Sequence, residues 1–188
     1  MEPDDLSLTP GLAEEWQNIL LLGTDMGGAE VAHGRTDAMM VLSVHRETGQ
    51  MKITSLIRDM LVPIPGASRG AKINAANAWG GPLLAVKTVN ELLELNIDRY
   101  CVADFNGFME VVNLMGGTQL ELTEEEAREV GAEKQEGPQH LDGWQTLAFA
   151  RIRRLDNNFG RNERQRKVLD ALLTQAKAQD TNSLMNTV

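Results

Sequence analysis

The chain has 188 residues, 42% of them hydrophobic, so it is long enough to bury a substantial core and too apolar to be disordered. Its net charge of −9 argues against general nucleic-acid binding. Its one cysteine, Cys101, excludes an internal disulfide bond; it lies in an apolar stretch and is expected to be buried.

No apolar run is long enough to cross a bilayer, and no signal peptide precedes the first predicted strand. Taken alone, the chain is therefore expected to be soluble. Its acidic, proline-bearing beginning, Met1–Pro10, predicts a mobile segment. The expected organisation is a lead-in, residues 1–17, followed by one domain, residues 18–188.

Short apolar runs bounded by turn residues predict the strands. In chain order these are Ile19–Leu22, Ala38–Val44, Met51–Ile57, Tyr100–Ala103 and Thr118–Leu122. The first is continuous enough to be buried on both faces. The second and third are separated by a short turn and are expected to pair antiparallel.

Helical spacing, caps and glycines predict the helices. They are Lys72–Trp79, a helix opened by Pro82, a helix from Phe105 to the Gly116–Gly117 stop, a short one from the capping box Thr123–Glu126 to about Ala132, Gly143–Ala150 and Arg161–Ala178. Residues 133–139 are expected to be a loop. This order of elements favours an α/β fold, with a mixed central sheet and helices on both faces.

Charged residues cluster where the first predicted strand ends and the second begins. Asp25 follows the first strand, and open α/β sheets bind ligands at that end of their strands. Arg35 and Asp37 are two residues apart, so in extended chain they share a face. Two carboxylates and a guanidinium predict a divalent metal and a phosphate. The alternative is that the aspartates are turn or cap residues. A further pair, Arg58–Asp59, follows the third strand.

The segment Arg151–Lys167 is strongly basic. It holds seven Lys and Arg against two Asp and Glu, a balance of +5 that leaves −14 for the rest of a chain of net charge −9. Such an island is either a solvated surface, for example one paired with the acidic segment Glu124–Glu133, or an anion site.

Spacing within this island favours anion binding at two places. Arg151 and Arg153 share a face only in extended chain, which predicts a helix end near Ala150. The side chains of Arg161, Arg164 and Gln165 lie on one face of the last helix. They sit in its first turns, where unpaired N–H groups attract anions. Arginine suits this role because its planar fork binds phosphate with two hydrogen bonds.

Seven segments resemble, in order, those of the LytR-CpsA-Psr family, and they cover about Asn18–Lys177. They are LLGTD, GRTDAMMVLSV, IRD…VPIPG, KINAANAWGGP, DFNGFMEVVNLMGG, HLDG…AFARIR and FGRNERQRKVL. The resemblance implies a phosphotransferase on the outer face of the bacterial cytoplasmic membrane, mainly in Gram-positive organisms. It would move a glycopolymer, such as teichoic acid or capsular polysaccharide, from an undecaprenyl-pyrophosphate carrier to peptidoglycan.

The resemblance also implies roles for residues. By motif, Asp25 and Asp37 hold Mg²⁺ beside the pyrophosphate, and an apolar tunnel holds the prenyl chain. The candidates for the general base are Asp37 and Asp59, between which spacing does not choose. The residues that match the pyrophosphate-binding positions are Arg35, Arg58, Arg151, Arg153, Arg161 and Gln165.

Family members usually carry an N-terminal transmembrane helix, which this chain lacks, so it resembles an excised outer domain. The family domain also commonly extends past the last helix, which predicts truncation at the C-terminus. Two other activities stay open: a pyrophosphatase that uses water as acceptor, and a module that binds polyprenyl phosphates without chemistry. Nucleic-acid binding through the basic island is disfavoured by the negative charge elsewhere.

Overall fold

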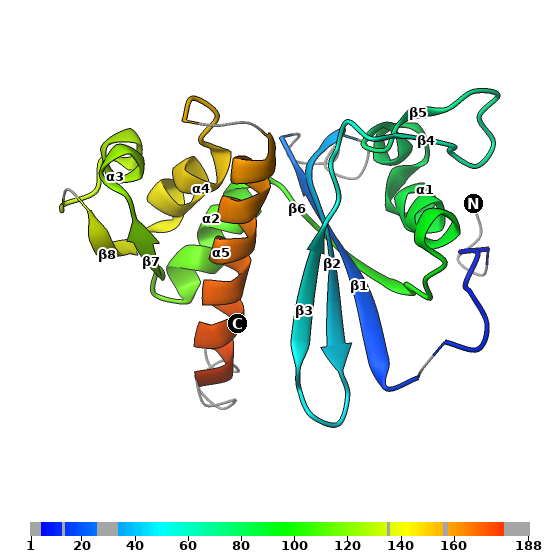
Figure 1. The fold of residues 1–188 in the computed structure, drawn as a ribbon, viewed down its shortest axis with the longest axis horizontal. Coiled ribbons are helices and arrows are strands. Elements are labelled where there is room, and N and C mark those ends of the chain that lie inside the picture. Colours follow the sequence, from blue (N-terminus) through cyan, green and yellow to red (C-terminus); the bar gives the residue numbers. More distant parts are fainter. Residues whose placement is uncertain (1–4, 13, 26–33, 135, 156–157, 179–188) are drawn as a thin grey trace. The chain divides into compact units, whose positions relative to one another are not determined.

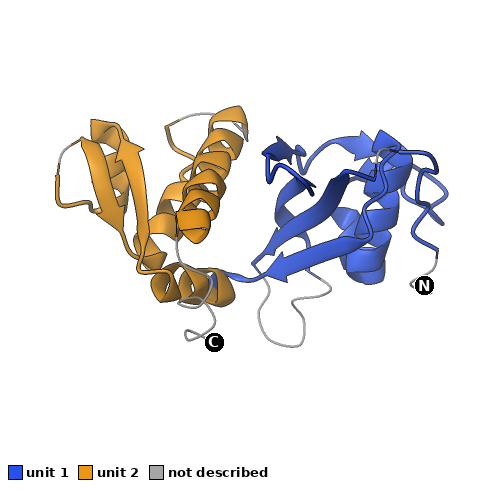
Figure 2. Ribbon diagram, turned by 90° about the horizontal axis from the view of Figure 1, so that it is seen from below, with its two compact units in different colours: residues 1–105 blue, residues 106–188 orange. Residues whose placement is uncertain are grey.

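The computed structural model describes residues 5–12, 14–25, 34–134, 136–155 and 158–178. The chain divides into two compact units, residues 1–105 and 106–188 (Figure 2). Each unit has a hydrophobic core of its own. The boundary falls at the start of a helix, and no change in composition marks it in the sequence.

Unit 1 contains a four-stranded sheet in the order β3 (Met51–Ser55), β2 (Thr36–His45), β1 (Trp16–Thr24) and β6 (Arg99–Ala103) (Figure 1). β2 pairs antiparallel with both β1 and β3, whereas β6 runs parallel to β1. A parallel neighbour requires a crossover, and α1 (Ala75–Leu93) lies in the connection that leads to β6. The predicted α/β fold with a mixed sheet and helices is confirmed.

The core of unit 1 is a single cluster in which strand and helix residues are buried together. Leu20 and Leu22 of β1 and Val86 and Val89 of α1 belong to it. Full burial of one such side chain contributes about 1.5–3 kcal/mol. The intervening residues of β1 are only partly buried, so the strand alternates. The prediction of a strand buried on both faces is wrong in this respect, because a sheet with antiparallel neighbours does not require equal burial of its two faces.

Helix α1 is kinked at Gly80–Gly81. Gly81 has a φ of 71°, which favours glycine, and Pro82 begins the second helical segment. The predicted break is confirmed. The first segment begins at Ala75 and not at Lys72, because Lys72 lies in β5 (Ala71–Lys72).

β5 pairs with β4 (Leu61–Val62) in a small hairpin that the proline-rich sequence did not predict. This hairpin follows the Arg58–Asp59 pair directly. The amide of Ile73 donates to the carbonyl of Met60 at 2.9 Å, which ties the hairpin to the start of α1. Arg58–Asp59 is therefore held between a strand and a helix start.

The beginning of the chain packs onto unit 1 where the sequence predicted a mobile lead-in. Leu6 is buried in the core, and the Asn90 side chain of α1 donates to its carbonyl at 2.8 Å. The amide of Thr9 donates to the carbonyl of Leu95 at 3.0 Å. Local composition could not show these contacts, because their partners lie about 85 residues further along the chain.

Cys101 is exposed, contrary to the expectation from its apolar neighbours. It lies in β6, which is an edge strand of the sheet. An edge strand is covered on one side only, and Arg99 and Tyr100 beside it are exposed as well. No helix in the part of the chain that the structure describes is long and apolar enough to cross a membrane.

Unit 2 combines helices with a two-stranded sheet. Its elements are α2 (Phe105–Leu114), β7 (Thr118–Leu122), α3 (Glu124–Val130), β8 (Gly137–Leu141), α4 (Gly143–Arg151) and α5 (Asn158–Ala178). β7 pairs antiparallel with β8, which was predicted to be mostly loop. Pro138 argues against a strand in the sequence, because proline is tolerated in a sheet only at an edge or a bulge. β8 meets this condition as one strand of a two-stranded sheet. The predicted capping box of Thr123 and Glu126 is confirmed.

Candidate functional site

The end of β1 and the start of β2 lie at the same end of the sheet, because the two strands are antiparallel. Thr24, the last residue of β1, pairs with Thr36, the first of β2. Asp25 and Arg35 lie just outside this pair, and both are exposed. The structure therefore brings Asp25, Arg35 and Asp37 to one end of the sheet, as the sequence predicted.

The register of β2 against β1 shifts at a β-bulge between Thr36 and Ala38. Gly23 pairs with Ala38, whereas the next residue of β1 pairs with Thr36, so Asp37 is the extra residue. A bulge interrupts the alternation of side chains and turns one of them in a new direction. The prediction that Arg35 and Asp37 share a face assumed a regular extended chain, and the pairing is irregular at this point.

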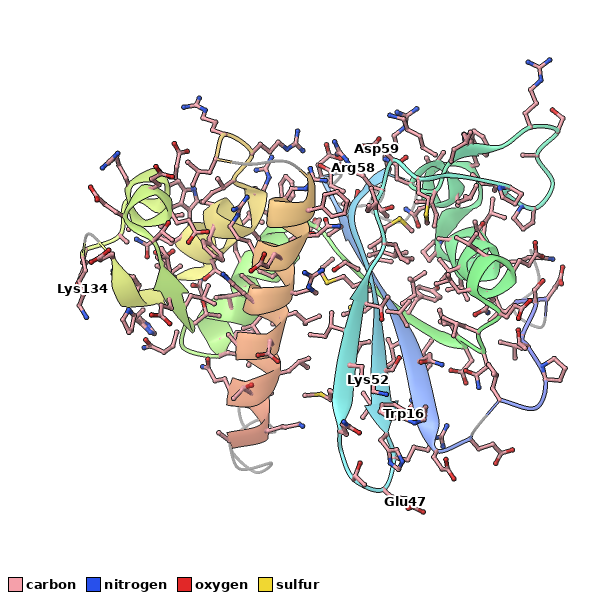
Figure 3. All side chains as sticks on the ribbon, viewed as in Figure 1. Trp16, Glu47, Lys52, Arg58, Asp59 and Lys134 are labelled. Atoms are coloured by element: carbon pink, nitrogen blue, oxygen red, sulfur yellow. The ribbon has the colours of Figure 1, made fainter. Side chains whose placement is uncertain are left out.

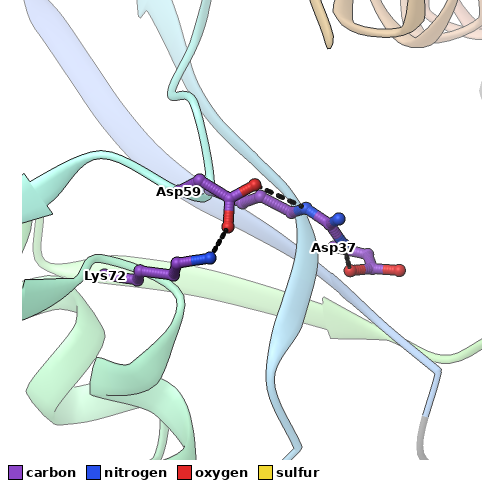
Figure 4. Close-up of polar contacts among 4 residues, drawn as sticks. Asp37, Asp59 and Lys72 are labelled. Carbon is purple, nitrogen blue, oxygen red and sulfur yellow. Dashed lines mark hydrogen bonds and ion pairs between the residues drawn. The ribbon is translucent and has the colours of Figure 1, made fainter.

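Arg58 links two carboxylates at this end of the sheet (Figure 4). Its Nη1 donates to Asp37 Oδ1, and its Nε lies 3.4 Å from Asp59 Oδ2. Lys72 Nζ donates to Asp59 Oδ1 at 2.7 Å. The four side chains thus form a row of alternating charge. The side chains of Arg58 and Asp37 are 22% and 27% exposed, so a ligand can reach them.

The pKa of Asp59 is lowered from its ordinary value. The hydrogen bond from Lys72 is the largest cause, and the charges of Arg58 and Lys72 act in the same direction, while desolvation opposes them. Asp59 is therefore ionised at neutral pH. A carboxylate with a lowered pKa is a weak proton acceptor, so these contacts suit Asp59 to orienting Arg58.

Two asparagines at the start of α1 hold the segments that carry the arginines. The backbone N–H of Asn74 donates to the carbonyl of Arg58 at 3.2 Å. The buried side chain of Asn77 donates to the carbonyl of Gly34 at 2.7 Å. Asn74 and Asn77 lie three residues apart on one face of the helix. They therefore connect the end of the sheet near Arg35 with the Arg58 segment.

The oxygens at this end of the sheet are of the type that magnesium binds. In the described part of the chain, no group of three or more His, Cys, Asp or Glu side chains is placed to hold a metal. Mg²⁺ needs only one or two carboxylates, because water and substrate phosphates complete its shell. Asp25 and Asp37 supply carboxylates, and the buried Thr36 hydroxyl between them in sequence makes no hydrogen bond with described residues.

The opposite end of the sheet in unit 1 has a different chemistry. There Lys52 lies 4.2 Å from the centroid of the Trp16 ring, and His45 packs edge-on against the same ring. Figure 3 shows Trp16 and Lys52 together, far along the strands from Arg58 and Asp59. The paired carboxylates and arginine are a property of one end of this sheet.

In unit 2, Arg151 is the last residue of α4, and both Arg151 and Arg153 are exposed. Ile152 between them is buried and has an extended ψ of 127°. The predicted helix end near Ala150, followed by extended chain, is confirmed. Arg161 is buried and Gln165 is partly buried on α5.

Arg164 departs from the expected anion site. It is buried, its Nη2 donates to the carbonyl of Ile152 at 2.9 Å, and its Nη1 lies 3.6 Å from Glu126 of α3. For this residue, pairing with the acidic helix is the interpretation that holds. A groove of about 1120 Å³ also lies in unit 2, lined by Gln119, His140 and other side chains, but it contains none of the predicted site residues.

Comparison with known proteins decides the family. A model of the LytR_cpsA_psr family matches residues 3–188. The chain belongs to the LytR-CpsA-Psr family. TagV of Bacillus subtilis strain 168, a polyisoprenyl-teichoic acid–peptidoglycan teichoic acid transferase, is 36% identical over 166 residues, which cover 83% of this chain and 42% of TagV. The chain spans about half the length of such relatives.

Solved structures of LytR-CpsA-Psr proteins have the same fold. B. subtilis TagT matches 87% of this chain and 66% of its own, with 31% identity and a TM-score of 0.76. A structure of YwtF (TagT) with bound octaprenyl pyrophosphate lipid matches 99% of this chain and 73% of its own, with 27% identity and a TM-score of 0.74. The resemblance stated from the seven motifs is confirmed.

In this LytR-CpsA-Psr chain, the motifs did not reveal the roles of three residues that hold the Arg58 end of the sheet: Lys72, Asn74 and Asn77, all in the KINAANAWGGP segment. Arg164 of FGRNERQRKVL was predicted to belong to an anion site, whereas its burial against Ile152 and Glu126 was not predicted. A signal for Asn77 was present, because an amide side chain in an otherwise apolar helix segment needs a partner. Asn74 acts through its backbone N–H, which side-chain patterns do not predict. No sequence signal separates Arg164 from the neighbouring arginines.

Proposed function

We propose that this chain transfers a glycopolymer from an undecaprenyl-pyrophosphate carrier to peptidoglycan. One observation within the chain carries the proposal: a partly exposed arginine, Arg58, is held between two carboxylates at one end of the sheet. The transferase name of TagV and the octaprenyl pyrophosphate bound to TagT support the reaction class. The natural substrate is then a lipid-linked wall polymer, and the site of action is the outer face of the bacterial cytoplasmic membrane.

The proposed reaction is an attack on phosphorus. A hydroxyl oxygen of the glycan bonds to the phosphorus atom that carries the polymer. The bond from this phosphorus to the bridging oxygen breaks, and the prenyl chain leaves as its monophosphate. The hydroxyl proton passes to a carboxylate of the protein. Negative charge builds up on the phosphate oxygens, where a positioned guanidinium stabilises it.

Arg58 is suited to stabilise this charge because its guanidinium is already oriented. Asp37 and Asp59 contact different nitrogens of the fork, which limits its rotation. An arginine held in this way binds oxyanions with less loss of side-chain freedom. Arg35 lies at the same end of the sheet and is proposed as a second contact. That Arg151, Arg153, Arg161 and Gln165 bind pyrophosphate stays a prediction from the motifs.

Asp37 is proposed as the proton acceptor. Both oxygens of Asp59 are engaged, by Lys72 and by Arg58, and its lowered pKa makes it a weak base. Asp37 is also proposed, with Asp25, to hold Mg²⁺. When bound, the ion would neutralise charge on the pyrophosphate. An apolar tunnel for the prenyl chain is part of the same proposal.

The test is transfer of a prenyl-pyrophosphate saccharide to peptidoglycan fragments in the presence of Mg²⁺. Arg58→Ala and Asp37→Ala are expected to reduce the rate on the order of 100-fold or more. Arg46→Ala is the matched control, because Arg46 is an exposed arginine of the same unit. An unchanged rate in both site variants rejects the assignment.

Two measurements separate the alternatives. Release of prenyl phosphate at equal rates with and without glycan indicates a pyrophosphatase. Binding of the lipid without any turnover indicates a binding module. Transfer that requires the glycan supports the proposed phosphotransferase.

A further inference from the structure

Arg164 carries a charge into the interior of unit 2. Its side chain is 4% exposed, and that of Glu126, its acidic neighbour, is 10% exposed. Burial of a charge is costly unless the group is paired and hydrogen-bonded. A buried guanidinium therefore needs partners that compensate its charge. The identity of these partners shows which segments Arg164 fixes in place.

The first partner is Glu126, whose orientation is fixed independently. Its Oε2 accepts from the amide of Thr123 at 3.1 Å, while the Thr123 hydroxyl accepts from the amide of Glu126. This capping box leaves Oε1 for Arg164, whose Nη1 lies 3.6 Å away. α3 therefore anchors one side of the guanidinium.

The second partner is the backbone of Ile152. Arg164 Nη2 donates to the carbonyl of Ile152 at 2.9 Å, and this bond is buried. The amide of Ile152 donates to Phe149 at 3.3 Å as the C-terminal cap of α4, and its side chain belongs to the core of unit 2. All three groups of this residue, its amide, side chain and carbonyl, are thus held.

Ile152 lies directly between Arg151 and Arg153, both of which are exposed. Fixing the carbonyl and side chain of the middle residue sets the directions in which its two neighbours project. The guanidinium of Arg164 therefore contacts the residue that lies between two arginines of the pyrophosphate-binding motif. A lysine in its place would bring a single nitrogen, whereas the guanidinium directs two separate nitrogens, Nη1 and Nη2, at its two partners.

We propose that Arg164, oriented by Glu126, is a positioning residue that holds Ile152 so that Arg151 and Arg153 are presented to the pyrophosphate. This inference rests on the proposed function for the identity of the ligand. It assigns the arginines of one short basic segment to different tasks. Arg151 and Arg153 bind the ligand, and Arg164 sets their geometry.

The experiment must separate positioning from stability. The double variant Arg164→Met with Glu126→Gln removes both buried charges and keeps an oxygen for the capping box. Replacement of a buried ion pair by uncharged side chains is often tolerated, so this variant is expected to fold. It nevertheless leaves the Ile152 carbonyl without its arginine donor. Arg164→Lys tests the fork alone.

Binding is measured with octaprenyl pyrophosphate and with octaprenol, which lacks the phosphates. Both variants are expected to lose affinity for the pyrophosphate lipid on the order of tenfold or more, with unchanged affinity for octaprenol. Arg128→Gln is the matched control, since Arg128 forms an exposed pair with Glu124 on the same helix α3. It is expected to leave both affinities unchanged.

Unchanged pyrophosphate affinity in the folded variants overturns the inference. A parallel loss for both lipids also overturns it, because that result indicates a general structural role. If the wild-type chain itself does not bind octaprenyl pyrophosphate, the proposed function fails. Amide hydrogen exchange at residues 152–154 then decides the positioning role alone: faster exchange in the double variant supports it, and equal exchange rejects it.

Discussion

Arg58 reaches across the end of the sheet in unit 1 and donates a hydrogen bond to the carboxylate of Asp37. The two residues lie 21 positions apart, on segments that the β2–β3 hairpin brings together. Asp37 is the extra residue of a β-bulge, so its direction differs from that of a regular strand residue. The ion pair thus depends on strand register as well as on residue type.

Replacement of Arg58 by lysine separates its charge from its geometry. Lysine keeps the positive charge but cannot contact two carboxylates with a planar fork. Transfer by Arg58→Lys is expected to lie between that of the wild type and that of Arg58→Ala. Steady-state rates with a prenyl-pyrophosphate saccharide measure this order, and Arg46→Lys serves as control. Full activity of the lysine variant contradicts a role for the fork.

The stability of unit 1 is expected to depend on pH through Asp59. Its folded-state pKa is lowered, so its contribution is present above the pKa of the unfolded state and is lost as pH falls through the folded pKa. Asp59→Asn should therefore lower the free energy of unfolding at pH 7. The difference from the wild type should shrink below about pH 4.

Denaturant titrations from pH 7 to pH 3 measure this difference. Lys72→Met removes the largest cause of the lowered pKa and is expected to weaken the pH dependence of the wild type. A constant difference between wild type and Asp59→Asn across this range contradicts the assignment.

Asn77 is expected to contribute to stability. Its buried side chain donates to the Gly34 carbonyl, next to Arg35. Asn77→Ala leaves that carbonyl without its donor and should destabilise the protein by about 1–3 kcal/mol. Chemical denaturation measures this change, and the exposed Asn106→Ala should remain within about 0.5 kcal/mol of the wild type. An equal effect of the two substitutions argues against a stabilising role for the hydrogen bond from Asn77 to Gly34.

Removal of divalent metal is expected to abolish transfer, and added Mg²⁺ should restore it. Asp25→Asn removes one carboxylate from the proposed magnesium set, so half-saturation should require on the order of tenfold more Mg²⁺. Asp98→Asn is a suitable control, because Asp98 is an exposed carboxylate of the same unit. The rate as a function of Mg²⁺ concentration measures both effects. Undiminished transfer by the wild type in excess chelator refutes the metal proposal.

Several parts of the fold follow from local sequence. The apolar run Ile19–Leu22, the Gly80–Gly81 break and the Thr123–Glu126 capping box each act within a few residues. The strand, the break and the capping box are all present in the structure, although the strand alternates between buried and partly buried residues. Short-range hydrogen bonds and backbone preferences determine such features, so the sequence alone contains them.

Other parts depend on partners that are distant in sequence. Strand β8 and the β4–β5 hairpin lack strong local patterns and form because pairing partners are available. Leu6 was expected to be mobile and Cys101 to be buried. Leu6 is buried because it packs on α1, and Cys101 is exposed because β6 is an edge strand.

For the candidate site, the sequence by itself determined the chemistry, because carboxylates and arginines recur in ordered motifs. Tertiary structure alone decided how these side chains are used. Strand register places Asp37 at a bulge, in contact with Arg58. Arg164, which the sequence predicted to contact the ligand, is buried and donates a hydrogen bond to the carbonyl of Ile152. The physical reason is that a motif specifies residue types along one segment, whereas direction and burial are set by elements that meet only when the chain is folded.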